Sequence, residues 1–406
     1  NMINVRRLAV MTFLGAGMLS DISAQDFSLQ ADTLNEARLP AQWDLQSCID
    51  YALEQNITIR KNRVTAESTQ IDVKTAKAAL FPSLSFSTSQ QVVNRPYQET
   101  SSRVSGSEII SSNSKTSYNG NYGLNASWTI YNGSKRLKTL KQERLNNQVA
   151  ELDVATSENT IKESIAQIYI QILYAAESVR VNENTLQVSI AQRDRGQELL
   201  NAGSIAKSDF AQLEAQVSTD RYQLVTAQAT LQDYKLQLKQ LLELDGENEM
   251  NVYLPKLSDE NVLAPLPAKK DVYVSALAIR PEIEASKLNV EASELGIDIA
   301  KSSYFPTISL SAGIGTNHTS GSDFTFGEQV KNGWNNSIGL SVSVPIFNNR
   351  QTKSAVQKAK LQRETDMLSL LDEQKALYKT IESLWLDANS CLLYTSPSPR
   401  DPKTSR

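Results

Sequence analysis

Residues 76–87 read AKAALFPSLSFS, and residues 300–311 read AKSSYFPTISLS. The two stretches lie 224 residues apart, and the same offset aligns residues 52–87 with residues 276–311 without a gap. Ten of these 36 aligned positions are identical, where average composition would give roughly two. The sequence is therefore predicted to be a tandem duplication with a repeat of about 220 residues.

Each repeat has the same predicted order of elements: a helix, a strand, a polar loop, a second strand and a very long helix. In the first copy, residues 45–80 have helical periodicity, and Phe81-Pro82 ends it because proline disfavours helical geometry in the residue before it. The apolar spacing then changes from helical to alternating. The predicted divisions are a first repeat at residues 43–244, a linker at 245–268 and a second repeat at 269–389.

All four predicted strands alternate between an apolar face and a face of small uncharged polar residues. The polar face is almost entirely Ser, Asn, Thr and Gly, which suits the water-filled lumen of a membrane-spanning barrel. The apolar face would then contact lipid, although a soluble sheet with one wet face would show the same alternation. The predicted lipid-facing residues are Leu124, Trp128, Ile130, Ile308, Leu310, Leu340, Val342 and Val344.

Four strands are too few to form a barrel with a lumen, because barrel diameter grows with strand number and about eight strands enclose only a side-chain core. An open sheet edge is also not tolerated in lipid, where no water is present to bind the backbone. Several copies of the chain must therefore contribute strands to one barrel. Three copies would give a barrel of about twelve strands.

The long helix of the first repeat is predicted over residues 134–201, which contain no proline. Its apolar residues follow the spacing of a coiled-coil seam, and its length corresponds to a rod of about 100 Å. The helix is expected to end at Asn201-Ala202-Gly203-Ser204, because Gly203 suits the left-handed position after a helix. A second helix would run back from about Lys207, forming a long hairpin.

Composition excludes several classes of protein. The net charge of −4 argues against a nucleic-acid-binding protein. One His and two Cys are too few for a zinc site, so no metal or cofactor is expected. No apolar run is long enough for a transmembrane helix, but residues 1–24 have the pattern of a secretory signal peptide. Cys48 is expected to be a buried small hydrophobic residue.

Catalysis is the rival class of function. A Ser-His-Asp triad would need His318, which lies in the Gly-, Ser- and Asn-rich stretch 317–336. This stretch is expected to be a surface loop, and a solvated histidine is the favoured interpretation. No catalytic residue is therefore predicted.

The order of short motifs resembles the TolC-type outer-membrane efflux protein family over residues 43–389. The motifs are Trp43-Asp44-Leu45, Tyr51-Ala52-Leu53, Leu80-Phe81-Pro82, Trp128-Thr129-Ile130-Tyr131-Asn132-Gly133, Leu200-Asn201-Ala202-Gly203, Arg280-Pro281-Glu282-Ile283, Tyr304-Phe305-Pro306 and Val344-Pro345-Ile346-Phe347. Each motif is weak alone, but their order and duplication are specific to the family.

The resemblance implies an α plus transmembrane β fold: a homotrimer whose 12-stranded outer-membrane barrel continues into a periplasmic α-helical coiled-coil tunnel. It also implies a periplasmic adaptor protein and an inner-membrane pump of the RND or ABC type as partners, with export of solutes or proteins. A trimeric surface-binding protein anchored by a barrel, without transport, is the alternative. The sequence does not indicate the cargo.

The resemblance assigns two roles to the hairpin tip. Asn201, Ala202, Gly203 and Ser204 correspond to the tip that contacts the adaptor. Ser208 and Asp209 align with polar residues that help to hold the aperture of the family shut. A helix cap is an equally good interpretation of Asp209.

The C-terminal region departs from the repeat. The second long helix is predicted to begin near Asn349, and the 216-residue offset between Ile130-Tyr131-Asn132 and Ile346-Phe347-Asn348 would place its turn near position 417, after the last residue, 406. Three prolines lie within residues 397–402. We expect residues 390–406 to be a tail foreign to the repeat, since prolines interrupt a helix.

Overall fold

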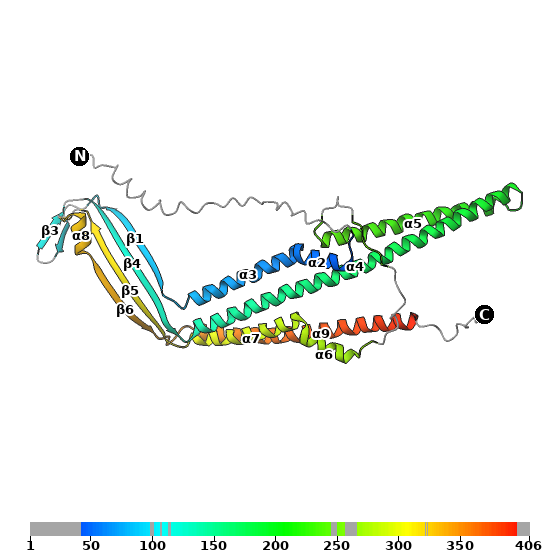
Figure 1. The fold of residues 1–406 in the computed structure, drawn as a ribbon. Helices are drawn as coiled ribbons and strands as arrows, with labels where there is room; N and C mark the ends of the chain where they lie inside the picture. The colour runs from blue at the N-terminus through cyan, green and yellow to red at the C-terminus, as the bar shows by residue number, and fades with distance from the viewer. Residues whose placement is uncertain are drawn as a thin grey trace.

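The computed structural model describes residues 42–97, 101–105, 108–112, 115–244, 250–255, 266–320, 322 and 324–395. The predicted signal peptide, most of the predicted linker and residues 396–406 lie outside these ranges. The strands gather at one end of an elongated molecule and the helices extend from them, so that the turn between α4 and α5 lies farthest from the sheet (Figure 1).

The described helices are α2 (Leu45–Gln55), α3 (Ile57–Ala78), α4 (Lys135–Asn201), α5 (Lys207–Leu241), α6 (Lys269–Ile279), α7 (Pro281–Ser302), α8 (Phe326–Asn332) and α9 (Gln351–Thr395). The described strands are β1 (Ser83–Asn94), β2 (Ser101–Ser105), β3 (Glu108–Ser112), β4 (Thr116–Asn132), β5 (Thr307–Thr319) and β6 (Asn335–Ser343).

The two repeats begin with helices of equal length at the offset of the sequence repeat. Both α2 and α6 have 11 residues, and both α3 and α7 have 22. Adding 224 to the bounds of α2 and α3 gives the bounds of α6 and α7. The equivalent residues Ile59 and Ile283 are both fully buried. The duplication therefore extends from the sequence to the backbone.

The single helix predicted over residues 45–80 is wrong, because the structure has a break at Asn56. The Asn56 side-chain oxygen accepts hydrogen bonds from the backbone N–H groups of Thr58 (2.9 Å) and Ile59 (3.4 Å), and so caps α3. Its Nδ2 donates to the carbonyl oxygen of Leu241 at 3.0 Å. The break thus ties the first helices to the end of α5.

Four strands form one antiparallel sheet in the order β1-β4-β5-β6. The inner strands β4 and β5 each pair on both sides, whereas β1 and β6 are the outer strands. A separate two-stranded hairpin, β2 with β3, lies within the stretch expected to be a polar loop. The helix α8 likewise interrupts the predicted loop at residues 317–336.

A compact hydrophobic core lies where α2, α3, α4 and α5 meet the segment that contains Val252. Trp43 and Val252 form a parallel β-bridge, and the Tyr169 hydroxyl donates to the carbonyl oxygen of Tyr253 at 2.5 Å. Cys48 is fully buried, as predicted. Burial raises the pKa of its thiol to about 12, with a smaller contribution from the carboxylate of Asp44. The thiol therefore stays protonated and unreactive.

The first part of the tail predicted at residues 390–406 is helical, because α9 continues to Thr395. That these residues are foreign to the repeat stays a prediction. Residues 390–395 contain no proline, so nothing in their backbone interrupts the helix. The first proline of the predicted tail is Pro397. Proline disfavours helical geometry in the residue before it, which here is Ser396. The rest of the predicted tail lies outside the described residues.

Gly133 joins the sheet to the long helix α4. Its φ is +67°, and the Ser302 hydroxyl donates to its carbonyl oxygen at 2.9 Å. A Cβ atom at this position would lie 2.7 Å from the backbone oxygen of Ser302. Both the left-handed backbone and the lack of space therefore require glycine.

We predict that Gly133→Ala lowers the free energy of unfolding by more than the ~1–2 kcal/mol that a left-handed backbone costs an alanine. The matched control is Gly203→Ala, because Gly203 has a φ of +71° but a Cβ atom there would meet no other atom within 4 Å. Denaturant titration followed by circular dichroism measures both. Equal losses would contradict a steric role for the contact with Ser302.

Candidate functional site

The pairing registers place the predicted apolar residues on one face of the sheet. Leu124 lies opposite both Phe86 and Ile314, and Leu310 lies opposite both Trp128 and Leu340. The large residues of this face are extensively exposed, Leu340 at 64% and Ile338 at 83%. Ile308 and Leu310 are half-buried between the neighbouring strands. A single chain thus presents a broad apolar surface to its surroundings.

The opposite face of the sheet is polar and uncharged. None of β1, β4, β5 and β6 contains Asp, Glu, Lys or Arg. Short hydrogen bonds cross between strands: the Ser83 and Ser127 hydroxyls are 2.8 Å apart, and Asn125 Nδ2 donates to the Ser87 hydroxyl at 3.3 Å. Uncharged polar side chains of this kind form hydrogen bonds with water and do not favour ions of either charge.

Two predicted lipid-facing residues, Ile130 and Val344, lie outside the regular pairing of the strands. A β-bulge shifts the register between Thr129 and Tyr131, so that Tyr131 lies opposite Ile308 and Ile130 is the extra residue. Val344 lies one residue beyond the end of β6. The bulge therefore places Tyr131 on the same face as Trp128, near the helical end of the sheet.

His318 is not in a solvated loop, as the sequence suggested, but near the end of β5 opposite Gly120. Its ring centroid lies 5.2 Å from Tyr118, 5.9 Å from Tyr122 and 5.0 Å from Phe326 of α8. Its Nδ1 has no hydrogen-bond partner among the described residues. The contacts are those of packing rather than of a catalytic base, and they attach α8 to the sheet.

The turn between α4 and α5 lies at the far end of the molecule from the sheet (Figure 1). Its residues Asn201, Ala202, Gly203 and Ser204 are all exposed. The N–H of Gly203 donates to the carbonyl of Leu200 at 2.9 Å and that of Ser204 to the carbonyl of Leu199 at 2.8 Å, which closes α4. The exposed tip is thus a fixed turn.

Asp209 and Ser208 interact within the first turn of α5. The Asp209 carboxylate accepts hydrogen bonds from the backbone N–H of Ala206 at 3.4 Å and from the Ser208 hydroxyl at 3.3 Å. Asp209 is the third residue of α5 and Ala206 is its N-cap, so the contact is the half of a capping box in which the carboxylate reaches back to the N-cap N–H. Both side chains are also exposed, so an aperture role stays a proposal.

Gly196 is a determinant of the tip that the sequence analysis did not identify. It is buried in α4, and a Cβ atom there would lie 2.4 Å from Leu213 Cδ1 of α5. The Leu213 side chain therefore packs directly against the backbone of α4 just above the tip. An isolated glycine inside a predicted coiled-coil helix was the available signal.

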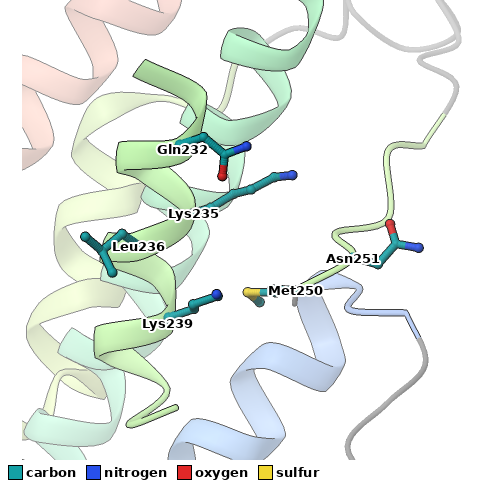
Figure 2. Close-up of a pocket in the computed structure, with 6 residues that line it drawn as sticks. All are labelled: Gln232, Lys235, Leu236, Lys239, Met250 and Asn251. Atoms are coloured by element: carbon teal, nitrogen blue, oxygen red, sulfur yellow. The ribbon is translucent and has the colours of Figure 1, made fainter. Parts of the chain in front are cut away.

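A basic hollow of about 540 Å³ lies between α5 and the segment that contains Met250. Figure 2 shows Gln232, Lys235 and Lys239 projecting from α5 towards this segment. Met250 also belongs to the hydrophobic core, so the hollow borders that core.

The described residues contain no cluster of three or more His, Cys, Asp or Glu side chains that could hold a metal ion. No described helix is both long enough and apolar enough to cross a membrane.

A sequence model of the family described as outer membrane efflux protein matches residues 48–243 and 272–387. The chain belongs to this family. Its two matched segments correspond to the two repeats and leave out the region between them, and the family is one of the outer membrane.

Two curated relatives are similar in sequence. Outer membrane efflux protein BepC of Brucella suis is 26% identical over 230 residues, which is 56% of this chain and 47% of BepC. Outer membrane protein TolC of Escherichia coli is 24% identical over 283 residues, which is 66% of this chain and 55% of TolC. The chain thus spans about half the length of these relatives.

Solved structures share the fold. A crystal structure of CusC matches with a TM-score of 0.68 at 20% identity, covering 84% of this chain and 75% of CusC. The Campylobacter jejuni CmeC outer membrane channel also matches with a TM-score of 0.68, at 17% identity, covering 82% of this chain and 68% of CmeC. The strand end and helical end of this chain therefore have the arrangement seen in outer-membrane channels.

We predict that Asp209→Ala lowers the free energy of unfolding by about 0.3–1 kcal/mol, because the first turn of α5 loses a carboxylate that accepts from the Ala206 N–H and interacts favourably with the helix dipole. Asp233→Ala is the control, since Asp233 is exposed on the same helix and its carboxylate accepts from Gln237 Nε2 at 2.8 Å, away from the helix terminus. Urea titration of both variants measures the difference. Equal effects of the two substitutions would rule out the cap.

Proposed function

We propose that the chain is one protomer of a trimeric outer-membrane exit duct, through which a tripartite efflux or type I secretion system releases its cargo. The observation that carries the proposal is the four-stranded sheet itself. One face is apolar, the other is polar and uncharged, and both outer strands have an edge that pairs with no other strand among the described residues.

Unpaired edges cannot face hydrocarbon, because each unsatisfied backbone group there costs several kcal/mol. The edge of β6 must therefore meet the edge of β1 in another copy. A ring of three such sheets closes a barrel of about twelve strands, wide enough to enclose water. The apolar face then contacts lipid, and the Ser and Asn face lines the lumen.

The helical region extends the duct away from the membrane. The helix α4 has 67 residues, which corresponds to about 100 Å. In this proposal the hairpin of α4 and α5 lies in the periplasm, and its exposed tip at Asn201–Ser204 contacts an adaptor protein that joins the duct to an inner-membrane pump of the RND or ABC type. Ser208 and Asp209 are proposed to contribute to the closed aperture.

The alternative is a barrel-anchored trimer that binds ligands at the cell surface without transport. The hairpin β2–β3 and the helix α8, at the sheet end of the molecule, would form the binding region. The long helical hairpin at the opposite end has no role in that alternative, so we favour the duct.

Single-channel recording separates the two functions. The full natural protein, purified from outer membranes and inserted in a planar bilayer, should give discrete conductance steps, and Ser208→Ala with Asp209→Ala together should raise the conductance if these residues narrow the aperture. A trimer that inserts without any conductance, in the wild type and in the double variant, would favour the surface-binding alternative.

We also predict that Leu340→Arg lowers stability by about 2–4 kcal/mol in a bilayer, because the arginine would face hydrocarbon near the middle of the barrel wall. Ser341→Arg is the matched control, since the adjacent side chain points to the opposite face. Folding yield into lipid vesicles, measured by the mobility shift of the folded form, reports both. Equal yields would show that the apolar face does not contact lipid.

A further inference from the structure

Asp220 of α5 is a buried carboxylate in the hairpin, with only 4% of its surface exposed. Its Oδ1 accepts a hydrogen bond from Gln216 Nε2 at 2.9 Å, and its Oδ2 accepts a short hydrogen bond from the Ser189 hydroxyl of α4. Both donors are neutral. The described residues place no Lys or Arg in an ion pair with this carboxylate.

A buried carboxylate with neutral partners is costly, and such groups in proteins are normally paired with a cation. Arg180 and Arg193 of α4 pair with Glu177 and Asp194. Arg195 of α4 and Arg221 of α5 are exposed, and neither pairs with Asp220 among the described residues. A cation from outside the described part of this chain could therefore pair with Asp220 without displacing an ion pair that is already present.

A groove of about 630 Å³ leads from the surface to Asp220. Asn184, Thr185, Gln192 and Gln216 contribute amide and hydroxyl groups to its walls. Amide and hydroxyl oxygens can accept hydrogen bonds from the charged group of a Lys or Arg side chain and leave the carboxylate free to pair with it. The groove is therefore suited to a Lys or Arg that enters from the surface.

An exposed apolar stripe runs along α4 beside the groove. Tyr174, Val181 and Val188 are 78%, 53% and 56% exposed and lie seven residues apart. A seven-residue apolar repeat is the seam of a helix that packs against another helix, and a single polar group beside such a seam fixes the register of the pair. The stripe and Asp220 together describe the docking face of one further helix.

We propose that a helix of the neighbouring copy of this chain covers the stripe and places a Lys or Arg side chain against Asp220. The inference rests on the proposed trimer, in which each copy must contact its neighbour along the helices as well as at the sheet edges. A closed ring uses two different faces of each copy, so the groove of one copy would face a different surface of its neighbour.

The chain itself carries suitable cations at this level of the hairpin. Arg195 and Arg221 are exposed and form no ion pair among the described residues. A second copy therefore supplies the required chemistry without a further protein.

The test uses the full natural protein in outer membranes, with a photo-reactive benzophenone side chain at Val188. Irradiation should produce an adduct of twice the protomer mass, and mass spectrometry should find the linked peptide in the same protein, with a Lys or Arg within one helical turn of the linkage. Asp220→Asn should lower the temperature at which the trimer dissociates in detergent, whereas Asp233→Asn, on an exposed part of the same helix, should not.

The outcomes separate this inference from the proposed function. If a detergent-resistant trimer forms but Val188 links only to another segment of the same chain, to a different protein or to nothing, the docking of a neighbouring copy is wrong and the duct proposal stands. If Asp220→Asn and Asp233→Asn trimers dissociate at the same temperature as the wild type, Asp220 is not part of an ion pair. If no trimer forms at all, the proposed function fails with it.

Discussion

Backbone hydrogen bonding at the edges of the sheet is the constraint on which the rest of the structure depends. The strands β1 and β6 end the order β1-β4-β5-β6 and have no partner on their outer sides within the described residues. Hydrocarbon offers no substitute for these hydrogen bonds, so a sheet with one lipid-facing side can exist only as part of a closed ring. The alternation of the side chains, the absence of charge on both faces and the duplication of the chain are all consistent with that requirement.

The duplication supplies two strands from each repeat, and the connections at the strand ends orient the strands relative to the helices. At the connection between β4 and α4, Gly133 has a left-handed backbone, and its carbonyl oxygen accepts a hydrogen bond from the hydroxyl of Ser302, a residue of the second repeat. The same contact therefore binds one repeat to the other at the point where the sheet becomes helical. At mid-length, Asn56 and Trp43 bind the first helices to α5 and to the segment after it. Those two contacts lie within the first repeat and the linker. Between the repeats, Gln142 Nε2 of α4 also donates to the carbonyl oxygen of Ala292 of α7 at 2.9 Å.

Much of this arrangement could be predicted from the sequence because it follows from periodicity. The 224-residue offset, the alternating strands and the uninterrupted α4 are patterns of many residues, and no single contact decides them. The features that were missed depend on one long-range contact each. Asn56 breaks a helical pattern because its amide reaches Leu241, and His318 stays in a strand because aromatic rings of β4 and α8 surround it. No local pattern contains those partners.

The candidate functional residues also include some that periodicity predicts and others that depend on a single long-range contact. The two faces of the sheet were evident from alternation, but the bulge at Ile130 exchanged one residue of the apolar face for Tyr131. The position of the tip was evident from Gly203, whereas the close approach at Gly196 depends on Leu213 of the opposite helix. The buried charge of Asp220 looked in the sequence like any acidic residue of a solvated helix face. Its importance follows only from its burial against Ser189.

Disulfide formation between the outer strands tests the central claim most directly. Ser341→Cys on β6 is combined in one chain with Ser83→Cys, Ser85→Cys or Ser87→Cys on β1. Within a chain these strands are three strand spacings apart, about 14 Å, which is too far for a disulfide, so any bond joins two copies. The account predicts that outer-membrane protein from at least one pair migrates as covalent dimers and trimers after mild oxidation. Monomers alone from all three pairs would contradict it.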